Sequence, residues 1–226
     1  MNRSILFDTE TTGLDPASDR VIEIAALELI NDLPSGRHYH ALVDPERDVP
    51  DEVVRVHGIT ALALRGKPRF ADIVGELQEF LGDGKLIAHN AAFDFAFLDA
   101  EFARLGLPRL EQSRMLCTLE LARARFPGLP NSLDALCRRF GIDLSARTLH
   151  NALLDCRLLA DVYVELTGGR QRGLLLGGPE TAAPSVAVYA LARPRTPRPI
   201  MPSAAELAAH AAFVARLREP LWAAAA

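Results

Sequence analysis

At 226 residues, with 49% hydrophobic and 24% charged side chains, the sequence has the composition of a folded domain with one sizeable core and room for a small appendage. No apolar run approaches the roughly 18 residues of a membrane span. The N-terminus MNRSILFDTE also lacks the apolar stretch of a signal peptide, so we expect a cytoplasmic protein without a membrane partner. The net charge of −4 excludes a general attraction to nucleic acid, so a polyanion would have to be bound by local cations.

The N-terminal part of the chain predicts strands. A short apolar run, Ile5-Leu6-Phe7, is followed by residues 20–29 (RVIEIAALEL), which are mostly apolar at both alternating sets of positions. A strand of that kind is buried on both faces. Residues 38–43 are a third candidate strand.

Helical periodicity begins at Phe70 and predicts four helices. The first is a stripe ended by the sequence Gly82-Asp83-Gly84. A short strand at 86–88 precedes a helix over about 92–105. A third helix is capped by Ser132, runs to Phe140 and stops at Gly141, and the last spans about 151–166. The inward positions are Phe70, Ile73, Val74, Leu77 and Leu81, then Phe95, Leu98, Phe102 and Leu105, and finally Leu154, Leu158, Val162 and Leu166.

Strands first, then helices with one strand among them, predict an α/β fold with a mixed central sheet flanked by helices. The composition changes after Gly169. Six prolines lie between Pro179 and Pro202, which is typical of a linker. Ser203 and Glu206 then form a capping box, and apolar residues follow at helical spacing to Trp222. A helix this short is marginal alone in water, so we expect it to have a partner.

Two carboxylates stand at the end of the first strand, in FDTETTGL. Residues i and i+2 of a strand face the same side, so Asp8 and Glu10 project together. Adjacent carboxylates repel one another unless a cation lies between them. The alternative is a solvated strand end whose acids do no chemistry. Backbone amides of Thr11-Thr12-Gly13 could approach a phosphate.

Two later segments contain an acid among apolar residues. Asp94 lies in HNAAFDFAFLDAEF, and Asp155 lies in HNALLDCRLLADVY, five residues after His150. Each acid, taken singly, also fits the exposed face of a helix, which is the interpretation we give to Asp99 and Asp161.

Taken together, FDTETTG, HNAAFDFAFL and HNALLD resemble the three motifs of the DEDD exonucleases, in the variant with His at H-x4-D. The resemblance covers residues 1 to about 168 and implies a ribonuclease H-like fold. Within that family, the VHGIT sequence at Val56–Thr60 is also similar to the epsilon subunits of bacterial DNA polymerase III, which are proofreading 3′→5′ exonucleases.

The resemblance implies a role for each matching residue. Asp8, Glu10, Asp94 and Asp155 would hold two Mg²⁺ or Mn²⁺ ions at the scissile phosphate. His150 would accept the proton of the attacking water, and the product would be a nucleoside 5′-monophosphate. Glu52, His57 and Phe93 would contact the terminal nucleotide, Glu52 through the 3′-hydroxyl and Phe93 through the base; the alternatives are a surface acid, a loop histidine and a core aromatic. We expect His89 to orient backbone rather than to touch substrate.

The tail also resembles parts of the epsilon subunits. Gln171, Leu174 and Leu176 fit the short peptides that bind bacterial sliding clamps. The terminal helix resembles the segment that docks on the polymerase alpha subunit, and its alternative is a helix folded back on its own domain. The expected organisation is an exonuclease domain over 1–169, a linker over 170–202 that is mobile until a partner binds, and a docking segment over 203–226.

Two other functions remain open. One is a free-standing exonuclease of the same chemistry that acts on RNA or on DNA repair intermediates. The other is a non-catalytic scaffold subunit, which would be expected to lack at least one of the four acids or the histidine.

Overall fold

The computed structural model describes residues 2–147, 149–168 and 201–217. These residues fall into two compact units, the first up to residue 168 and the second from residue 201. The predicted clamp peptide lies outside the described residues. In chain order the elements of the first unit are β1 (Arg3–Thr11), β2 (Val21–Ile30), β3 (Leu33–Leu42), α1 (Asp51–His57), α2 (Ala61–Leu64), α3 (Phe70–Leu81), β4 (Lys85–Ala88), α4 (Ala91–Arg104), a 3₁₀ turn η1 (Gln112–Arg114), β5 (Met115–Cys117), α5 (Thr118–Arg125), α6 (Leu133–Phe140) and α7 (Ala152–Leu166).

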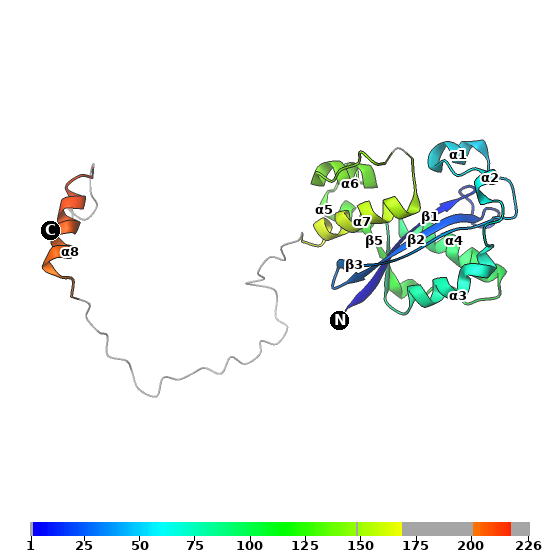
Figure 1. Ribbon diagram of the computed structural model, residues 1–226, viewed down its shortest axis with the longest axis horizontal. Coiled ribbons are helices and arrows are strands. Elements are labelled where there is room, and N and C mark those ends of the chain that lie inside the picture. Colours follow the sequence, from blue (N-terminus) through cyan, green and yellow to red (C-terminus); the bar gives the residue numbers. More distant parts are fainter. Residues whose placement is uncertain (1, 148, 169–200, 218–226) are drawn as a thin grey trace, which may run out of the picture. The chain divides into compact units, whose positions relative to one another are not determined.

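The five strands form one mixed sheet in the order β3-β2-β1-β4-β5 (Figure 1). The first three strands are an antiparallel meander, whereas β4 pairs parallel to β1 and β5 pairs parallel to β4. The central strand β1 and its neighbour β4 therefore end at the same edge of the sheet. The segment after β4 and the end of β1 meet there, which is where ligands bind in sheets of this kind.

The residues of β1 alternate between the two faces of the sheet, and each face has its own core. Ile5 and Phe7 pack with α3 and α4. Leu6 packs on the opposite face with α5, α6 and α7. Figure 1 shows these three helices on the other side of the sheet from α3. Since Asp8 and Glu10 continue the Leu6 set, the period of two directs both carboxylates toward the α7 face.

Most predicted elements are confirmed, and the exceptions have local causes. Leu105 was expected in the core but is 39% exposed, because α4 ends at Arg104. The chain then turns at Gly106, whose φ is 70°, and Leu107 packs against the core instead. The start of α6 at Ser132 and its end at Gly141 agree with the prediction. In α7, Leu158 and Val162 are buried as predicted, but Leu154 and Leu166 are only partly buried.

The second unit contains α8 (Ala204–Val214). Ser203 and Glu206 form the predicted capping box. The helix ends at Val214, so the prediction of one continuous helix to Trp222 is wrong, and Trp222 itself lies outside the described residues. Within the described ranges, no helix combines the length and the apolar character needed to cross a membrane.

Candidate active site

A pocket of about 480 Å³ opens at the edge of the sheet where β1 and β4 end. All five residues predicted to be catalytic line it, namely Asp8, Glu10, Asp94, His150 and Asp155. His57 and Phe93 line it as well. Glu52 is exposed on the first turn of α1 and does not line the pocket, so its contact with the 3′-hydroxyl stays a prediction.

The two carboxylates of β1 face the pocket from the sheet, as the alternation requires. Burial raises the pKa of Asp8 well above its usual range, and the charges of Asp94 and Glu10 raise it further. Burial also raises the pKa of Glu10, to about 8, although His150 opposes the shift. With a pKa of about 8, Glu10 holds its proton at neutral pH unless a cation reaches it.

Asp94 comes to the same place on the first turn of α4. Asn90 has a φ of 66°, and this left-handed residue turns the chain from β4 into the helix. The backbone N–H and the hydroxyl of Thr9 both donate to Asp94 Oδ1, at 3.1 and 2.7 Å. Burial raises the pKa of Asp94 to about 7, against the effect of these hydrogen bonds. Thr9 thus fixes one oxygen of Asp94 beside the two β1 acids.

His150 and Asp155 are positioned by the start of α7. Asn151 is the N-cap, and its side chain accepts from the N–H of Leu154 at 3.0 Å. His150 Nδ1 lies 3.3 Å from Asp155 Oδ2. The hydrogen bond to Asp155 raises the pKa of His150. Burial raises the pKa of Asp155, but hydrogen bonds from Arg147 and His150 outweigh it and leave this pKa below its usual value.

The segment that carries His150 is anchored on both sides. Before α7, the N–H of His150 donates to the carbonyl of Val56 in α1 at 3.1 Å. At the helix start, Glu23 of β2 accepts from Asn151 Nδ2 at 2.9 Å and from the N–H of Ala152 at 3.0 Å. Glu23 is only 1% exposed, so these contacts lie in the protein interior. They tie the candidate base to both the sheet and α1.

Gly58 of the VHGIT sequence allows α1 to approach this segment. Its φ is 75°, and a Cβ there would lie 2.6 Å from a methyl of Leu149. The Leu149 methyl is the end of an exposed side chain and could move, but the left-handed backbone at position 58 would strain any other residue. The glycine of VHGIT thus has a structural reason in this turn.

Arg147 is the main site residue that the sequence did not reveal. Its Nε and Nη2 contact the two oxygens of Asp155 at 2.6 and 2.7 Å. Its Nη1 contacts Asp134 Oδ1 at 2.7 Å. Arg147 sits in the loop before α7, where an arginine alone gives no signal. Only the fold shows that it points into the pocket.

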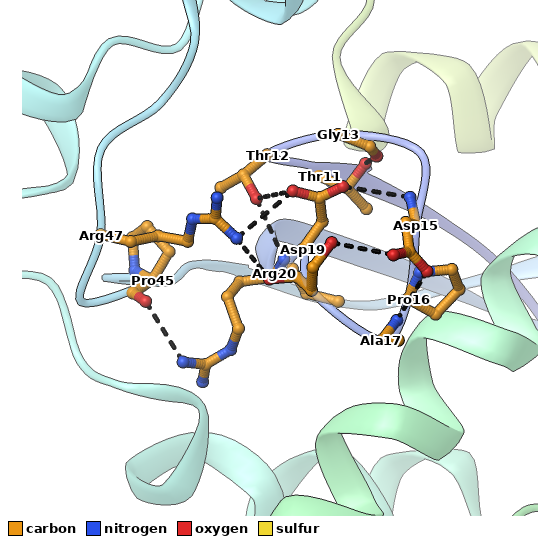
Figure 2. Close-up of polar contacts among 12 residues, drawn as sticks. Thr11, Thr12, Gly13, Asp15, Pro16, Ala17, Asp19, Arg20, Pro45 and Arg47 are labelled. Atoms are coloured by element: carbon orange, nitrogen blue, oxygen red, sulfur yellow. Dashed lines mark hydrogen bonds and ion pairs between the residues drawn. The ribbon is translucent and has the colours of Figure 1, made fainter.

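The loop after β1 is closed by polar contacts (Figure 2). Asp19 accepts from the Thr12 hydroxyl at 3.2 Å and from the Asp15 N–H at 3.0 Å, and Arg47 pairs with it at 3.3 Å. A Cβ on Gly13 would lie 2.2 Å from the Asp19 carboxylate, so this loop needs glycine there. The N–H of Thr12 donates to the carbonyl of Arg20 at 2.9 Å. The expectation that this amide is exposed for a phosphate is therefore wrong.

Apolar side chains form another part of the pocket wall. Leu14, in the loop just described, is 83% exposed, and Val56 is 48% exposed. The ring centroids of Phe93 and Phe97 lie 4.7 Å apart, with the rings tilted by 46°. Exposed apolar side chains beside a charged site suit the flat faces of a nucleobase. Neither Leu14 nor Val56 was singled out from the sequence, although Leu14 directly follows FDTETTG and Val56 begins VHGIT.

The donor atoms fit a hard divalent cation. Glu10, His150 and Asp155 each present a ligand atom within 4.8 Å of the others, and Asp8 and Asp94 line the same pocket. Carboxylate oxygens are the ligands that Mg²⁺ and Mn²⁺ prefer. Burial raises the pKa values of Asp8 and Glu10, so a divalent cation beside them would offset the cost of burying their charged forms.

Comparisons with known proteins agree with this geometry. The exonuclease family model matches residues 5–163. The DNA polymerase III subunit epsilon of Rickettsia felis is 50% identical over 173 residues, which cover 75% of this chain and 76% of the relative. That of Rickettsia conorii is 43% identical over 221 residues, covering 95% and 96%.

The fold is also similar to solved exonuclease structures. Exonuclease X in complex with 5′ overhanging duplex DNA has a TM-score of 0.59 and 28% identity, over 74% of this chain and 92% of that one. The mixed sheet with helices on both faces is thus the ribonuclease H-like exonuclease fold expected from the motifs. The chain belongs to the exonuclease family and, within it, to the epsilon subunits of DNA polymerase III.

Proposed function

We propose that this chain is the proofreading 3′→5′ exonuclease of a bacterial replicative DNA polymerase, releasing nucleoside 5′-monophosphates from DNA 3′ ends. The observation that carries the proposal is the meeting of four acids and one histidine, from β1, α4 and the start of α7, in a single pocket. The match to an epsilon subunit over 95% of the chain supports the replicative role.

Asp8, Glu10, Asp94 and Asp155 would hold two divalent ions, Mg²⁺ or Mn²⁺. When bound, such ions lower the pKa of the attacking water and stabilise the leaving 3′ oxygen. His150 is suited to take the proton of that water, since its side chain is 48% exposed at the pocket. The hydrogen bond from its N–H to Val56, and those from Asn151 and Ala152 to Glu23, hold this segment in place.

The neighbouring side chains would hold the terminal nucleotide. Phe93 offers a half-buried aromatic face, and Leu14 and Val56 offer exposed apolar surface beside it. His57 Nδ1 accepts from the N–H of Ile59 at 3.0 Å, which leaves the ring proton on Nε2 as a donor. A pocket of this kind grips the base by stacking, which every base provides, so it suits an enzyme that removes any mismatched nucleotide.

The segments after residue 169 would connect the exonuclease to its partners. We assign residues 1–169 to the exonuclease domain, 170–202 to a linker and 203–226 to docking on the polymerase alpha subunit. Within the described part of the second unit, Leu207 and Phe213 of α8 are 55% and 58% exposed, which is consistent with a helix that binds a partner. Gln171, Leu174 and Leu176 would bind the sliding clamp. Tethering raises the local concentration of primer ends without tight DNA affinity.

A primer-shortening assay tests the proposal. The full chain is mixed with a 5′-labelled primer, matched or mismatched at its 3′ end and annealed to template, in Mg²⁺ or in EDTA. Shortening from the 3′ end should require metal and be faster on the mismatch, because a frayed end is easier to open. Asp8→Asn should lower the rate by roughly a thousandfold, since several kcal/mol of charge stabilisation are lost.

Asp161→Asn is the matched control, because Asp161 is an exposed acid on the same helix as Asp155 and is absent from the pocket. It should cut at the wild-type rate. An all-RNA strand completes the assay. Faster cutting of RNA than of DNA would keep the chemistry but reject the proofreading role, and absence of cutting on both would favour a scaffold.

A further inference from the structure

The guanidinium of Arg147 is paired with Asp155, which is one of the acids of the proposed metal site. Both oxygens of Asp155 are engaged, by Nε at 2.6 Å and by Nη2 at 2.7 Å. This is a bidentate pair, in which a planar fork satisfies a whole carboxylate. Only 9% of the Arg147 side chain and 5% of the Asp155 side chain are exposed, so water weakens the pair little.

A bidentate arginine engages one lone pair on each oxygen of Asp155 and neutralises its charge, so it competes with a metal ion for this acid. Glu10, His150 and Asp155 form the cluster that could hold a cation, and Asp155 is the member that Arg147 covers. On the basis of the proposed metal-dependent function, we infer that Arg147 is the resident counter-cation of Asp155, and that a divalent ion must displace it to bind.

Asp134 is a second partner that can hold the guanidinium of Arg147 after it is displaced from Asp155. Nη1 of Arg147 already contacts Asp134 Oδ1 at 2.7 Å, on the side away from Asp155. Asp134 is 38% exposed and belongs to α6, so the contact does not depend on α7. When the ion takes Asp155, Arg147 keeps this second partner and stays in the pocket wall. Displacement then exchanges one ion pair and leaves no buried charge unpaired.

The contact between Arg147 and His150 also supports the displacement of Arg147 from Asp155. Nη2 of Arg147 lies 3.0 Å from His150 Nδ1, and Asp155 Oδ2 lies 3.3 Å from that same nitrogen. An arginine only donates, so its contact needs Nδ1 to be an acceptor, whereas the contact with the carboxylate needs Nδ1 to carry a proton and donate. One nitrogen cannot do both at once. Release of Arg147 from Asp155 removes the conflict.

The charge of Arg147 offsets the negative charge of the pocket. Among the described residues that line the pocket, Arg147 is the only lysine or arginine, and it faces five carboxylates there. Without it, Asp155 would be a buried anion next to other buried acids. Arg147 thus stabilises the folded site before metal enters, and it lowers the affinity for metal by the same free energy, because the two effects are linked.

Metal titration of the full chain without DNA tests the inference. Binding of Mn²⁺ is followed by calorimetry for wild type and Arg147→Gln, and the Tm of each is measured in EDTA and in saturating Mn²⁺. Arg147→Gln should bind Mn²⁺ about tenfold more tightly, in line with ordinary coupling energies. Its Tm should fall in EDTA and return close to wild type in Mn²⁺. A merely structural arginine would give weaker metal binding and a Tm loss in both conditions.

Arg138→Gln is the matched control. Arg138 also pairs with Asp134, at 3.7 Å, but it is 72% exposed and no contact joins it to Asp155. Its Mn²⁺ affinity should stay within twofold of wild type. Arg147→Lys provides a second variant in case Arg147→Gln folds poorly. A single ammonium cannot form the fork, so its Mn²⁺ affinity should lie between those of wild type and Arg147→Gln.

Asp134→Asn separates the proposed exchange from simple charge removal. In the wild-type background it should weaken Mn²⁺ binding, because the displaced arginine loses its second partner. In the Arg147→Gln background the effect should disappear. A persistent effect there, or unchanged or weaker Mn²⁺ binding by Arg147→Gln alone, would overturn the inference while leaving the proposed function standing. If wild type and variants all fail to bind Mn²⁺, both are overturned.

Discussion

Two groups of buried carboxylates lie in this fold, and their surroundings differ. Glu101 of α4 is 1% exposed and is matched by arginines, with Arg20 Nε and Nη2 at 2.8 and 3.0 Å and Arg104 Nη1 at 3.4 Å. In the pocket, no arginine contacts Asp8, Glu10 or Asp94 within the residues that the structure describes, and burial raises all three pKa values. A buried acid with its own cation stabilises the fold, whereas buried acids without one are prepared for a cation from solution.

Glu23 represents a third arrangement, next to the pocket. It is as buried as Glu101, but its partners are the amide of Asn151, the N–H of Ala152 and the ring of His40, whose Nε2 lies 2.7 Å away. Its role is to hold the start of α7. The replacement of glutamate by glutamine keeps the shape and removes the charge, so it can be applied to Glu101, Glu10 and Glu23 to test the three roles.

The largest loss of stability is expected for Glu101→Gln. The change leaves Arg20 and Arg104 without their anion. Their side chains are 21% and 30% exposed, so the cost should be about 2–3 kcal/mol, below that of breaking a fully buried pair. Urea unfolding followed by circular dichroism would measure it. Glu120→Gln, at an exposed position of α5, is the control and should stay within about 0.5 kcal/mol of wild type. A loss below about 1 kcal/mol for Glu101→Gln would mean that the pairs with Arg20 and Arg104 contribute little to the free energy of unfolding.

Glu10→Gln, unlike Glu101→Gln, should increase the stability of the fold in metal-free buffer. The folded-state pKa of Glu10 is about 8 and its ordinary value is 4.5, so the folded chain holds a proton that the unfolded chain releases. Stability from this group is complete below pH 4.5 and is lost as the pH rises through 8. Asp8 and Asp94 titrate together with Glu10, so we expect a loss of a few kcal/mol between pH 5 and pH 8.

Melting curves in EDTA across that pH range would check this. Glu10→Gln should show a flatter decline than wild type and a higher Tm at pH 8, together with lost exonuclease activity. Mg²⁺ should raise the Tm of wild type at pH 8 more than at pH 5, because protons compete with the ion. Parallel declines of wild type and Glu10→Gln would contradict the raised pKa.

The smallest effect on stability, about 1 kcal/mol, is expected for Glu23→Gln. Its effect on catalysis should be larger than its effect on folding. A glutamine oxygen cannot accept from all three donors, so the start of α7 shifts and kcat falls by roughly tenfold while KM for a primer changes little. Steady-state kinetics would show the split. Glu28→Gln is the control, since Glu28 is a buried glutamate of the same strand that pairs with Arg3 and Arg37 away from the pocket. An unchanged kcat in Glu23→Gln would reject the positioning role.

Much of the fold was readable because its signals are local. The period of two in β1 predicts that Asp8 and Glu10 share a face, and both line the pocket. Ser132 and Asn151 accept hydrogen bonds at helix starts that the sequence places correctly. By contrast, β5 has only three residues, and α1 and α2 have seven and four, which are too short for periodicity to detect.

The parts of the site that could not be read depend on contacts between distant residues. Glu23 lies in an apolar strand with nothing beside it to show that Asn151 would reach it. Arg147 is near Asp155 in the chain, but its second partner Asp134 belongs to another helix. Leu14 was visible as the residue after a known motif, yet its exposure at the pocket follows from the loop that Asp19 closes.

The central strand has a consequence for how the protein is made. During synthesis β1 emerges before α4 and α7, and its acids meet Asp94 more than eighty residues later and Asp155 only when α7 has emerged. Domains are synthesised from the N-terminus at finite speed, and contacts between distant segments form late. A nascent chain that stops before α7 therefore cannot assemble the cutting site. The nuclease stays inactive until the domain is nearly complete, so an unfinished chain poses no threat to nearby DNA.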